Sequence, residues 1–223
     1  MKTLVDDFIA PPCKGDIEFI YQDEHILVIN KPTQLLSLSG KNPLNKDSVH
    51  WRLVQQYPSA KLAHRIDFGT SGLMLVGLND MAIAALCRQF SERLVDKQYV
   101  AVLDGIIDSD TGVISAPIAK DKESFPRQKI CSQTGKPASS AYEVISRCES
   151  SSSTRVTFSP ITGRTHQLRI HSYHIGHPIL GCDIYNNVHS YERSERLMLH
   201  ASFLSFQHPH TEQNMAFDSA APF

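Results

Sequence analysis

An uninterrupted apolar run constrains this chain most: residues 72–78, GLMLVGL, directly follow a charged and polar cluster, HRIDFGTS, at residues 64–71. An apolar run of this length is typical of a central strand that is covered on both faces. A loop at the end of a core strand is anchored to the core, so the reactive groups in it are held still. The pattern therefore predicts a buried strand that begins at a candidate functional loop.

Alternating apolar residues, turn residues and helix caps predict the other elements. Asp47 or Ser48 is suited to cap a helix near residues 49–56, and Asn79 or Asp80 a helix that runs to about Ser91. Strands are expected at residues 17–21, 25–32, 97–105, 139–148, 154–160 and 199–209, and a short helix between Thr165 and Gly176. Strands outnumber helices and most connections are hairpin-like. The predicted fold class is therefore α+β, a mixed, largely antiparallel β-sheet with flanking helices.

Composition is that of an ordinary globular protein with a sizeable core. Of 223 residues, 41% are hydrophobic and 20% charged. The five cysteines are scattered and never form C-x-x-C, which favours reduced thiols in a cytoplasmic protein over a disulfide framework or a zinc site. No stretch reaches transmembrane length, and Asp6 and Asp7 stand where a signal peptide would need its apolar run.

The charges are unevenly distributed along the chain. The formal net charge is −1, but residues 1–24 carry six of the 23 acidic and two of the 22 basic residues, so the remaining 199 residues have a formal charge of +3. Between Lys120 and Lys136 five basic residues accompany two acidic ones. Local positive patches are compatible with this pattern, although such a run is more often a solvated face.

Asp67 is the first candidate for chemistry, although an Asp in such a loop is more often a turn or cap residue. Phe68 and the apolar run beyond it indicate partly dry surroundings, in which a carboxylate stays ionised only beside a cation or several donors. Arg169 can supply that cation, since residues 164–177 contain two Arg, four His and no acid. This segment needs negative charge from Asp67 or from phosphate. Solvation or simple salt bridging of Arg164 and Arg169 is the alternative.

Tyr99 is the third candidate. It alternates with Ala101 and Leu103 along a predicted strand, where a tyrosine serves equally well as a packing residue or as a platform that stacks on a planar ring. The sequence contains no H-E-x-x-H, G-x-x-x-x-G-K, G-x-G-x-x-G or G-x-S-x-G motif. It therefore indicates neither a metal site, nor a nucleotide cofactor, nor a serine nucleophile.

Several ordered motifs resemble those of one family. HRIDFGTSGLMLV resembles the H-R-L-D-x-x-T-S-G-L signature of the RluA-type pseudouridine synthases, KQYVA their tyrosine motif and GRTHQLRIH their arginine motif. NKPTQLLS, GHPILGCDIY and LHASFLSFQHP resemble the same family in the same order, so the resemblance spans residues 21–223. It implies the pseudouridine synthase fold and an isomerase that flips a uridine out of RNA and converts it to pseudouridine. It also implies RNA as the partner, and neither cofactor nor metal.

The resemblance further implies roles for single residues. Asp67 corresponds to the catalytic aspartate, Arg169 to the arginine that pairs with it, and Tyr99 to the tyrosine that stacks on the target base. Arg65 corresponds to the arginine that enters the RNA in place of the flipped base, and Leu168 to an apolar wall of the pocket. The expected catalytic residues are Asp67, Tyr99 and Arg169, and the expected substrate-binding residues are His64, Arg65, Arg164 and Leu168.

Two residues depart from the family pattern. Ile66 replaces the usual Leu, which is a mild change of core packing. Cys182 stands where the family commonly has Asp in G-D-x-x-Y, which affects a loop contact rather than the chemistry.

The short chain and GKPASSAYEV are most similar to the dual-specificity members, which act on large-subunit ribosomal RNA and on a transfer RNA. We expect an N-terminal segment at residues 1–20, a single catalytic domain at 21–223 without a separate RNA-binding domain, and a cytoplasmic monomer that binds no membrane. A non-catalytic RNA-binding module of the same fold is the first alternative. A metal-dependent hydrolase that uses His64, Asp67 and His166 is a more distant one.

Overall fold

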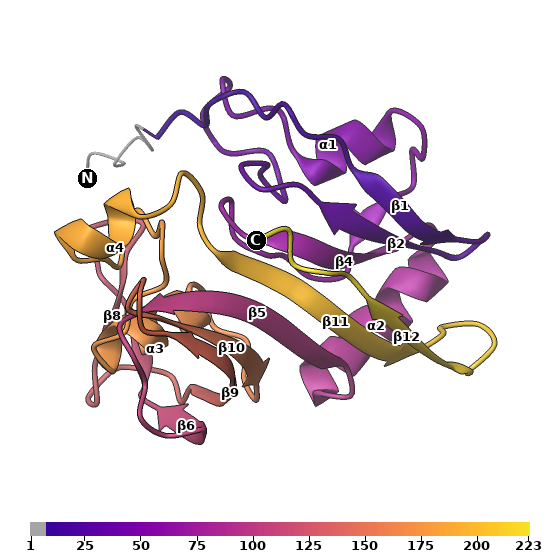
Figure 1. The fold of residues 1–223 in the computed structure, drawn as a ribbon. Coiled ribbons are helices and arrows are strands. Elements are labelled where there is room, and N and C mark those ends of the chain that lie inside the picture. Colours follow the sequence, from indigo (N-terminus) through magenta and orange to yellow (C-terminus); the bar gives the residue numbers. More distant parts are fainter. Residues whose placement is uncertain (1–7) are drawn as a thin grey trace. The chain divides into compact units, whose positions relative to one another are not determined.

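The apolar run that follows the His64–Asp67 cluster forms strand β4 (Ser71–Gly77), whose seven residues are all buried. It pairs antiparallel with β2 (Ile26–Lys31) and with the short β3 (Lys61–Leu62), and β2 pairs with β1 (Glu18–Gln22) (Figure 1). This is a computed structural model that describes residues 8–223, so Asp6 and Asp7 lie outside the described residues. The prediction of a central strand covered on both faces is confirmed.

The chain divides into two compact units, each with its own hydrophobic core. The first unit comprises the described residues up to Val95 together with Leu204–Ser219, and the second comprises Asp96–Phe203 with Ala220–Phe223. Strand β11 (Leu199–Gln207) is divided between them and pairs with β12 (Asn214–Asp218).

Two helices belong to the first unit. Helix α1 (Val49–Val54) is capped by Ser48, and α2 (Asp80–Glu92) by Asn79, whose side chain accepts the N–H of Ala82. Ala82 and Leu86 of α2 pack against apolar side chains of β2, β4 and the end of β11. Ala84 and Cys87 lie on the exposed side of α2.

The described part of the N-terminal segment packs on the same unit. The side-chain amide of Asn45 donates to the Phe8 carbonyl at 2.7 Å and its oxygen accepts the Ala10 N–H at 2.8 Å. The rings of Phe8 and Phe68 meet edge to face, with their centroids 5.5 Å apart. The expected boundary at residue 21 falls inside β1.

The second unit is built on an antiparallel sheet. Its strands lie in the order β5 (Asp96–Asp104), β10 (Ser153–Pro160), β9 (Ser139–Cys148) and β6 (Thr111–Ser115). Strands β7 (Ile118–Lys120) and β8 (Gln128–Ile130) form a separate hairpin, and α3 (Gln167–His174) packs near β8 and β9. The short α4 (Val188–Glu192) follows.

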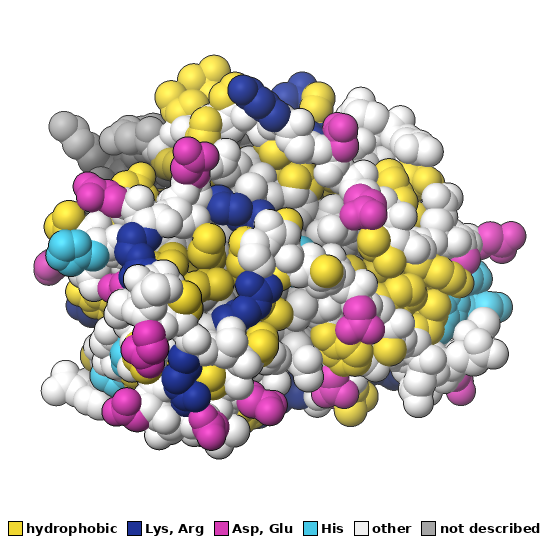
Figure 2. Space-filling view, in the orientation of Figure 1, with side chains coloured by type: hydrophobic (Ala, Val, Ile, Leu, Met, Phe, Trp, Pro, Cys, Tyr) yellow, Lys and Arg dark blue, Asp and Glu magenta, His cyan; other side chains and the backbone are white. Residues whose placement is uncertain are grey.

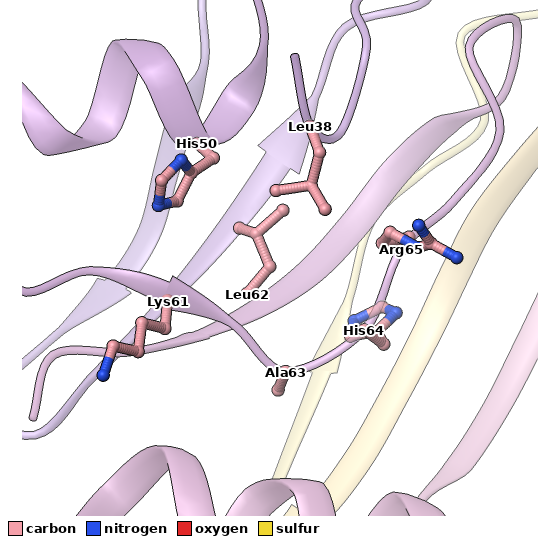
Figure 3. A pocket seen from close by; sticks show the side chains of 7 residues that line it. All are labelled: Leu38, His50, Lys61, Leu62, Ala63, His64 and Arg65. Carbon is pink, nitrogen blue, oxygen red and sulfur yellow. The ribbon is translucent and has the colours of Figure 1, made fainter. Parts of the chain in front are cut away.

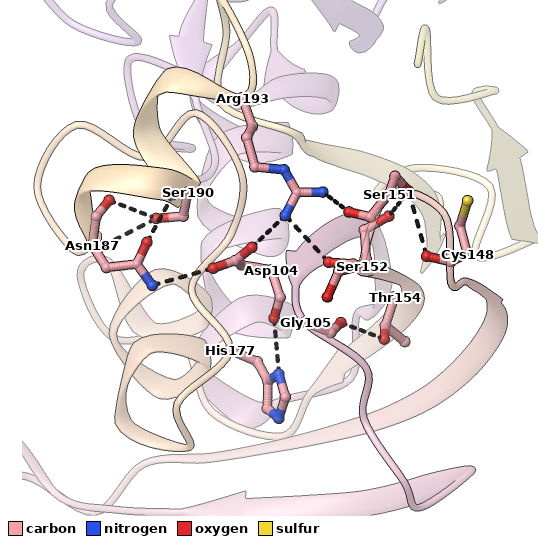
Figure 4. A network of polar contacts seen from close by, with 11 residues as sticks. Asp104, Gly105, Cys148, Ser151, Ser152, Thr154, His177, Asn187, Ser190 and Arg193 are labelled. Carbon is pink, nitrogen blue, oxygen red and sulfur yellow. Dashed lines mark hydrogen bonds and ion pairs between the residues drawn. The ribbon is translucent and has the colours of Figure 1, made fainter.

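A polar network fixes the segment around α4 to strand β5 (Figure 4). The Asp104 carboxylate accepts from the Arg193 guanidinium and, at 3.2 Å, from the Asn187 side chain. Arg193 also donates to the carbonyls of Ser151 and Ser152 in the β9–β10 turn. These contacts hold the chain that follows α3 against the sheet of the second unit.

The predicted fold class is confirmed, since the strand pairs within each unit are antiparallel and few helices accompany them. On the face drawn in Figure 2, acidic side chains alternate with Lys and Arg, in agreement with the small net charge. Within residues 8–223, no helix is both long and apolar enough to cross a membrane.

Candidate active site

The loop that carries Asp67 is held by hydrogen bonds to four consecutive carbonyls. The Ile66 carbonyl accepts from the Ser37 hydroxyl at 2.7 Å, and the Asp67 carbonyl from the Thr70 N–H at 3.1 Å. The Phe68 carbonyl accepts from the Lys31 ammonium at 3.3 Å, and the Gly69 carbonyl from the Thr33 hydroxyl at 2.7 Å. Because no carbonyl between residues 66 and 69 lacks a partner, the backbone under the Asp67 side chain is fixed before any substrate binds.

Three of these four donors come from one stretch, NKPTQLLS at residues 30–37, which begins at the end of β2. Strand β2 pairs with β4 so that Lys31 lies opposite Gly72. The loop of residues 64–70 leads directly into β4, and the donors therefore stand beside it. Two motifs that are more than twenty residues apart in the sequence thus form one structural unit.

Lys31 is the most unusual of these donors, because its side chain is fully buried (0% exposed). Its ammonium donates to the carbonyls of Pro32 at 2.9 Å and Leu35 at 2.8 Å, besides that of Phe68. A buried ammonium is tolerated only where several acceptors replace its hydration shell. Here those acceptors belong to the two loops that Lys31 joins.

The backbone conformation explains the glycine in the T-S-G part of the loop motif. Gly72 has φ of +113°, a conformation that L side chains rarely adopt, so a residue with a Cβ would be strained there. Ser71 and Thr70 are buried beside it. The glycine allows the chain to turn from the loop into β4 without a break in the pairing with β2.

The three predicted residues of this loop differ in exposure. Asp67 is half-buried, Arg65 is exposed, and His64 is half-buried. His64 and Arg65 line a hollow of about 420 Å³ together with Lys61, Leu62 and other side chains of the first unit, which Figure 3 shows from close by. These lining side chains form a rim that includes cations and no acid.

His64 makes contacts of a structural kind. Its Nε2 accepts the Leu75 N–H of β4 at 3.0 Å, and its ring stacks on Phe90 of α2 with centroids 4.6 Å apart. An imidazole whose Nε2 accepts a hydrogen bond is the neutral tautomer with its proton on Nδ1. The predicted substrate-binding role of His64 stays a prediction, and the contacts shown orient the loop.

In the second unit, α3 carries the predicted arginine. The helix begins at Gln167 after His166, which has φ of +56°, so Thr165 is not the N-cap that the sequence suggested. The cap changes because His166 takes the left-handed conformation and its Nδ1 lies 3.0 Å from the Tyr185 hydroxyl. The predicted C-terminal end is confirmed: Ile175 is the C-cap and Gly176 follows with φ of +84°.

Arg169 lies one turn into α3 and is only 4% exposed. Its Nε and Nη2 both donate to the Cys182 sulfur at 3.4 Å, and Nη2 also donates to the Asp183 carboxylate. The guanidinium carbon lies 5.7 Å from the centre of the Tyr185 ring. Arg169 is thus a buried cation whose plane is set by the segment that follows α3.

The other predicted residues of this unit surround α3 or lie on the sheet. Tyr99 on β5 stands opposite Phe158 of β10 and packs against the core of the unit, which also contains Leu168. Arg164 donates from Nε to the Pro137 carbonyl at 3.1 Å, and its backbone N–H donates to the Gln167 side chain. Tyr99 and Leu168 therefore share one apolar cluster.

A buried histidine stiffens α3. His171 donates from Nε2 to the Ala116 carbonyl at 3.0 Å, and its Nδ1 lies 3.0 Å from the Ser140 hydroxyl, so the neutral ring satisfies both neighbours. Burial lowers the pKa of His171, against the opposing effect of its bond to the Ala116 carbonyl. The ring stays neutral at physiological pH and ties α3 to β9.

The structure therefore gathers the predicted residues in two groups. His64, Arg65 and Asp67 stand on one loop of the first unit, and Tyr99, Arg164, Leu168 and Arg169 belong to the second. The pairing of Asp67 with Arg169 joins residues of different units and stays a prediction. Sequence reasoning missed Lys31, Thr33 and Ser37 as supports of the loop, although their motif, NKPTQLLS, was among those that resemble the family.

The antiparallel sheets of both units agree with the fold of an RNA-modifying isomerase, the class of protein that the resemblance implies. The chain matches the model of the RNA pseudouridylate synthase family over residues 25–174 and belongs to that family. It is therefore an isomerase that acts on uridine in RNA.

Individual relatives extend the match to nearly the whole chain. The chain is 46% identical to the dual-specificity RNA pseudouridine synthase RluA of Yersinia pestis, over 92% of this chain and 98% of that protein. It is 42% identical to the protein of the same name from Escherichia coli K12, over 96% and 97%. Among solved structures, human RNA pseudouridylate synthase domain containing 1 is 29% identical, covers 96% of this chain and 86% of its own, and has a TM-score of 0.81.

Proposed function

We propose that this enzyme isomerises specific uridines to pseudouridine in large-subunit ribosomal RNA, in a transfer RNA anticodon stem-loop, or in both. The observation that carries the proposal is the Asp67 loop, whose four consecutive carbonyls are hydrogen-bonded so that the carboxylate is preorganised. The choice of RNA is supported by relatives named dual-specificity RNA pseudouridine synthases, which match 92% and 96% of this chain.

Asp67 is the proposed catalytic group. The reaction breaks the bond between the ribose and the ring nitrogen, turns the uracil, and joins it again through C5. The carboxylate attacks the sugar or the base, or removes a sugar proton, and all three routes need it ionised and aimed. Arg169 would keep Asp67 charged, a task that suits a planar guanidinium better than the point charge of a lysine.

Tyr99 and Leu168 are proposed to enclose the uracil. Both belong to the apolar cluster of the second unit, and a closed apolar surface would keep the detached base from escaping. The phenol of Tyr99 would stack on the ring and relay a proton. These roles need no group beyond the side chains of this chain.

The remaining predicted residues would bind RNA. Removing a uridine from its stack costs a few kcal/mol and costs least in a loop. The exposed Arg65 could fill the gap that the flipped base leaves, and the cationic rim on which it stands suits the phosphate backbone. Arg164 and His64 would contribute from α3 and from the Asp67 loop. We further propose that the two units act as one catalytic domain in a cytoplasmic monomer.

Tritium release tests this function. RNA labelled with tritium at uridine C5 must lose that hydrogen when the new carbon–carbon bond forms. We expect release from an anticodon stem-loop, a ribosomal RNA fragment, or both with the wild type, and none with Asp67→Asn. Asp80→Asn is the control, since Asp80 is exposed on the same unit and pairs with Lys61 at the surface.

The same assay separates the alternative function. Full activity in Asp67→Asn would contradict the catalytic role of Asp67. If the wild type bound RNA with a steep salt dependence but left uridines intact in both fragments and in total cellular RNA, the non-catalytic binding module would be preferred.

A further inference from the structure

The segment that holds Arg169 contains Cys182, one of the two residues that depart from the motifs which this chain resembles. Cys182 lies in G-C-D-I-Y, residues 181–185. Its side chain is fully buried (0% exposed), and its sulfur accepts three N–H groups at 3.4 Å: Nε and Nη2 of Arg169 and the backbone N–H of Tyr185. The buried cysteine is therefore in direct contact with the guanidinium.

This contact restrains the guanidinium strongly. A planar group whose adjacent Nε and Nη2 donors both point at one atom can rotate little about its long axis. Asp183 accepts from Nη2 and the Tyr185 ring lies 5.7 Å from the guanidinium carbon, so further contacts limit its tilt. Sulfur is a weaker and more polarizable acceptor than the carboxylate oxygen of Asp183.

We propose that Cys182 is a positioning residue for Arg169: its buried sulfur fixes the Nε–Nη2 edge of the guanidinium. The inference rests on the proposed function, in which the guanidinium acts on Asp67. Asp183 is 59% exposed, so water screens its carboxylate and the buried sulfur is the firmer anchor. A carboxylate at residue 182 would hold the same edge but would neutralise the cation further.

The competing explanation is packing, because Cys182 also belongs to the apolar cluster of the second unit. Two substitutions separate the roles. Cys182→Ser keeps an acceptor and loses apolar character, whereas Cys182→Val keeps the apolar volume and removes the acceptor. If the sulfur positions Arg169, the serine variant is the more active one. If the sulfur only packs, the order reverses.

The experiment measures kcat and KM by tritium release from the RNA that the wild type uses, with folded fractions checked by urea denaturation. For Cys182→Val we expect kcat to fall about 10-fold to 100-fold, the size of effect that a misplaced catalytic group produces, with KM within about twofold. Cys182→Ser should stay within about threefold of the wild type, since a neutral hydrogen bond is retained. Ile179→Val, a buried change in the same cluster, controls for loss of packing.

The Arg169 Nε–H resonance supplies a readout that activity does not. It should shift and exchange faster with solvent in Cys182→Val and stay near the wild-type signal in Cys182→Ser and Ile179→Val. A valine variant with wild-type kcat and an unchanged resonance would overturn the inference while the proposed function stands. An inactive wild type on every RNA would instead refute the proposed function, and the resonance would then decide the positioning role alone.

Discussion

Replacing Lys31 by methionine should destabilise the first unit and slow the reaction. Methionine keeps most of the volume of the lysine stem but removes the ammonium, so the carbonyls of Pro32, Leu35 and Phe68 lose their common donor. A buried acceptor left without a partner costs about 1–3 kcal/mol. The Leu35 bond is buried and the other two are partly buried, and the lysine no longer has to be desolvated. The expected loss of unfolding free energy is about 2–4 kcal/mol.

The assay for this prediction is urea denaturation, with tryptophan fluorescence as the probe of unfolding. Trp51, the only tryptophan of the chain, lies on α1, so its signal reports on the unit that contains Lys31. Lys61→Met is the matched control. Lys61 pairs with Asp80 on the surface, where such a pair contributes about 0–1 kcal/mol.

Turnover provides the second measurement. The Phe68 carbonyl adjoins Asp67. Without the Lys31 ammonium as its donor, the loop should hold the Asp67 carboxylate less rigidly, and kcat should fall about tenfold or more. The reasoning is refuted if Lys31→Met is as stable as Lys61→Met to within about 0.5 kcal/mol and as active. In that case the three hydrogen bonds of the ammonium would not be what holds the loop.

Two further predictions concern titration in the second unit. Burial lowers the pKa of His171 below its value in the unfolded chain, which is about 6.5. The unfolded state therefore binds more protons in acid, and the unfolding free energy falls as the pH drops from about 6.5 toward the folded-state pKa. Denaturation at a series of pH values should therefore show a steeper acid loss in the wild type than in His171→Gln, and equal slopes would contradict it. Hydrogen bonds from Thr134 and Ser150 respectively lower the pKa of Cys131 and Cys148 to about 7. Mass spectrometry should find both alkylated by iodoacetamide at neutral pH well before the buried Cys182, and preferential labelling of Cys182 would refute this.

Local periodicity was sufficient to predict most of the fold. The apolar run of β4, the alternation of β9 and β10 and the caps of α1 and α2 are properties of neighbouring residues, and each element was found close to its expected place. The short strands β3, β6, β7, β8 and β12 were not predicted, because two to five residues leave no pattern to recognise.

The candidate site divides in the same way. The loop with Asp67 and the helix with Arg169 could be predicted from spacing and resemblance, since each motif is continuous. The residues that support the Asp67 loop could not be predicted, because a lysine at the end of a strand, such as Lys31, is nearly always solvated. Its burial follows from the register of β2 on β4, which brings the Asp67 loop to it.

The role proposed for Cys182 could not be predicted from the cysteine alone. A single cysteine in a sequence is most simply interpreted as a small buried hydrophobic residue, and Cys182 does belong to the apolar cluster of the second unit. What gives it a second role is Arg169, thirteen residues earlier on α3, whose Nε and Nη2 both donate to its sulfur. The second role therefore follows from the fold around α3, which brings the sulfur to the guanidinium, and not from the type of residue alone.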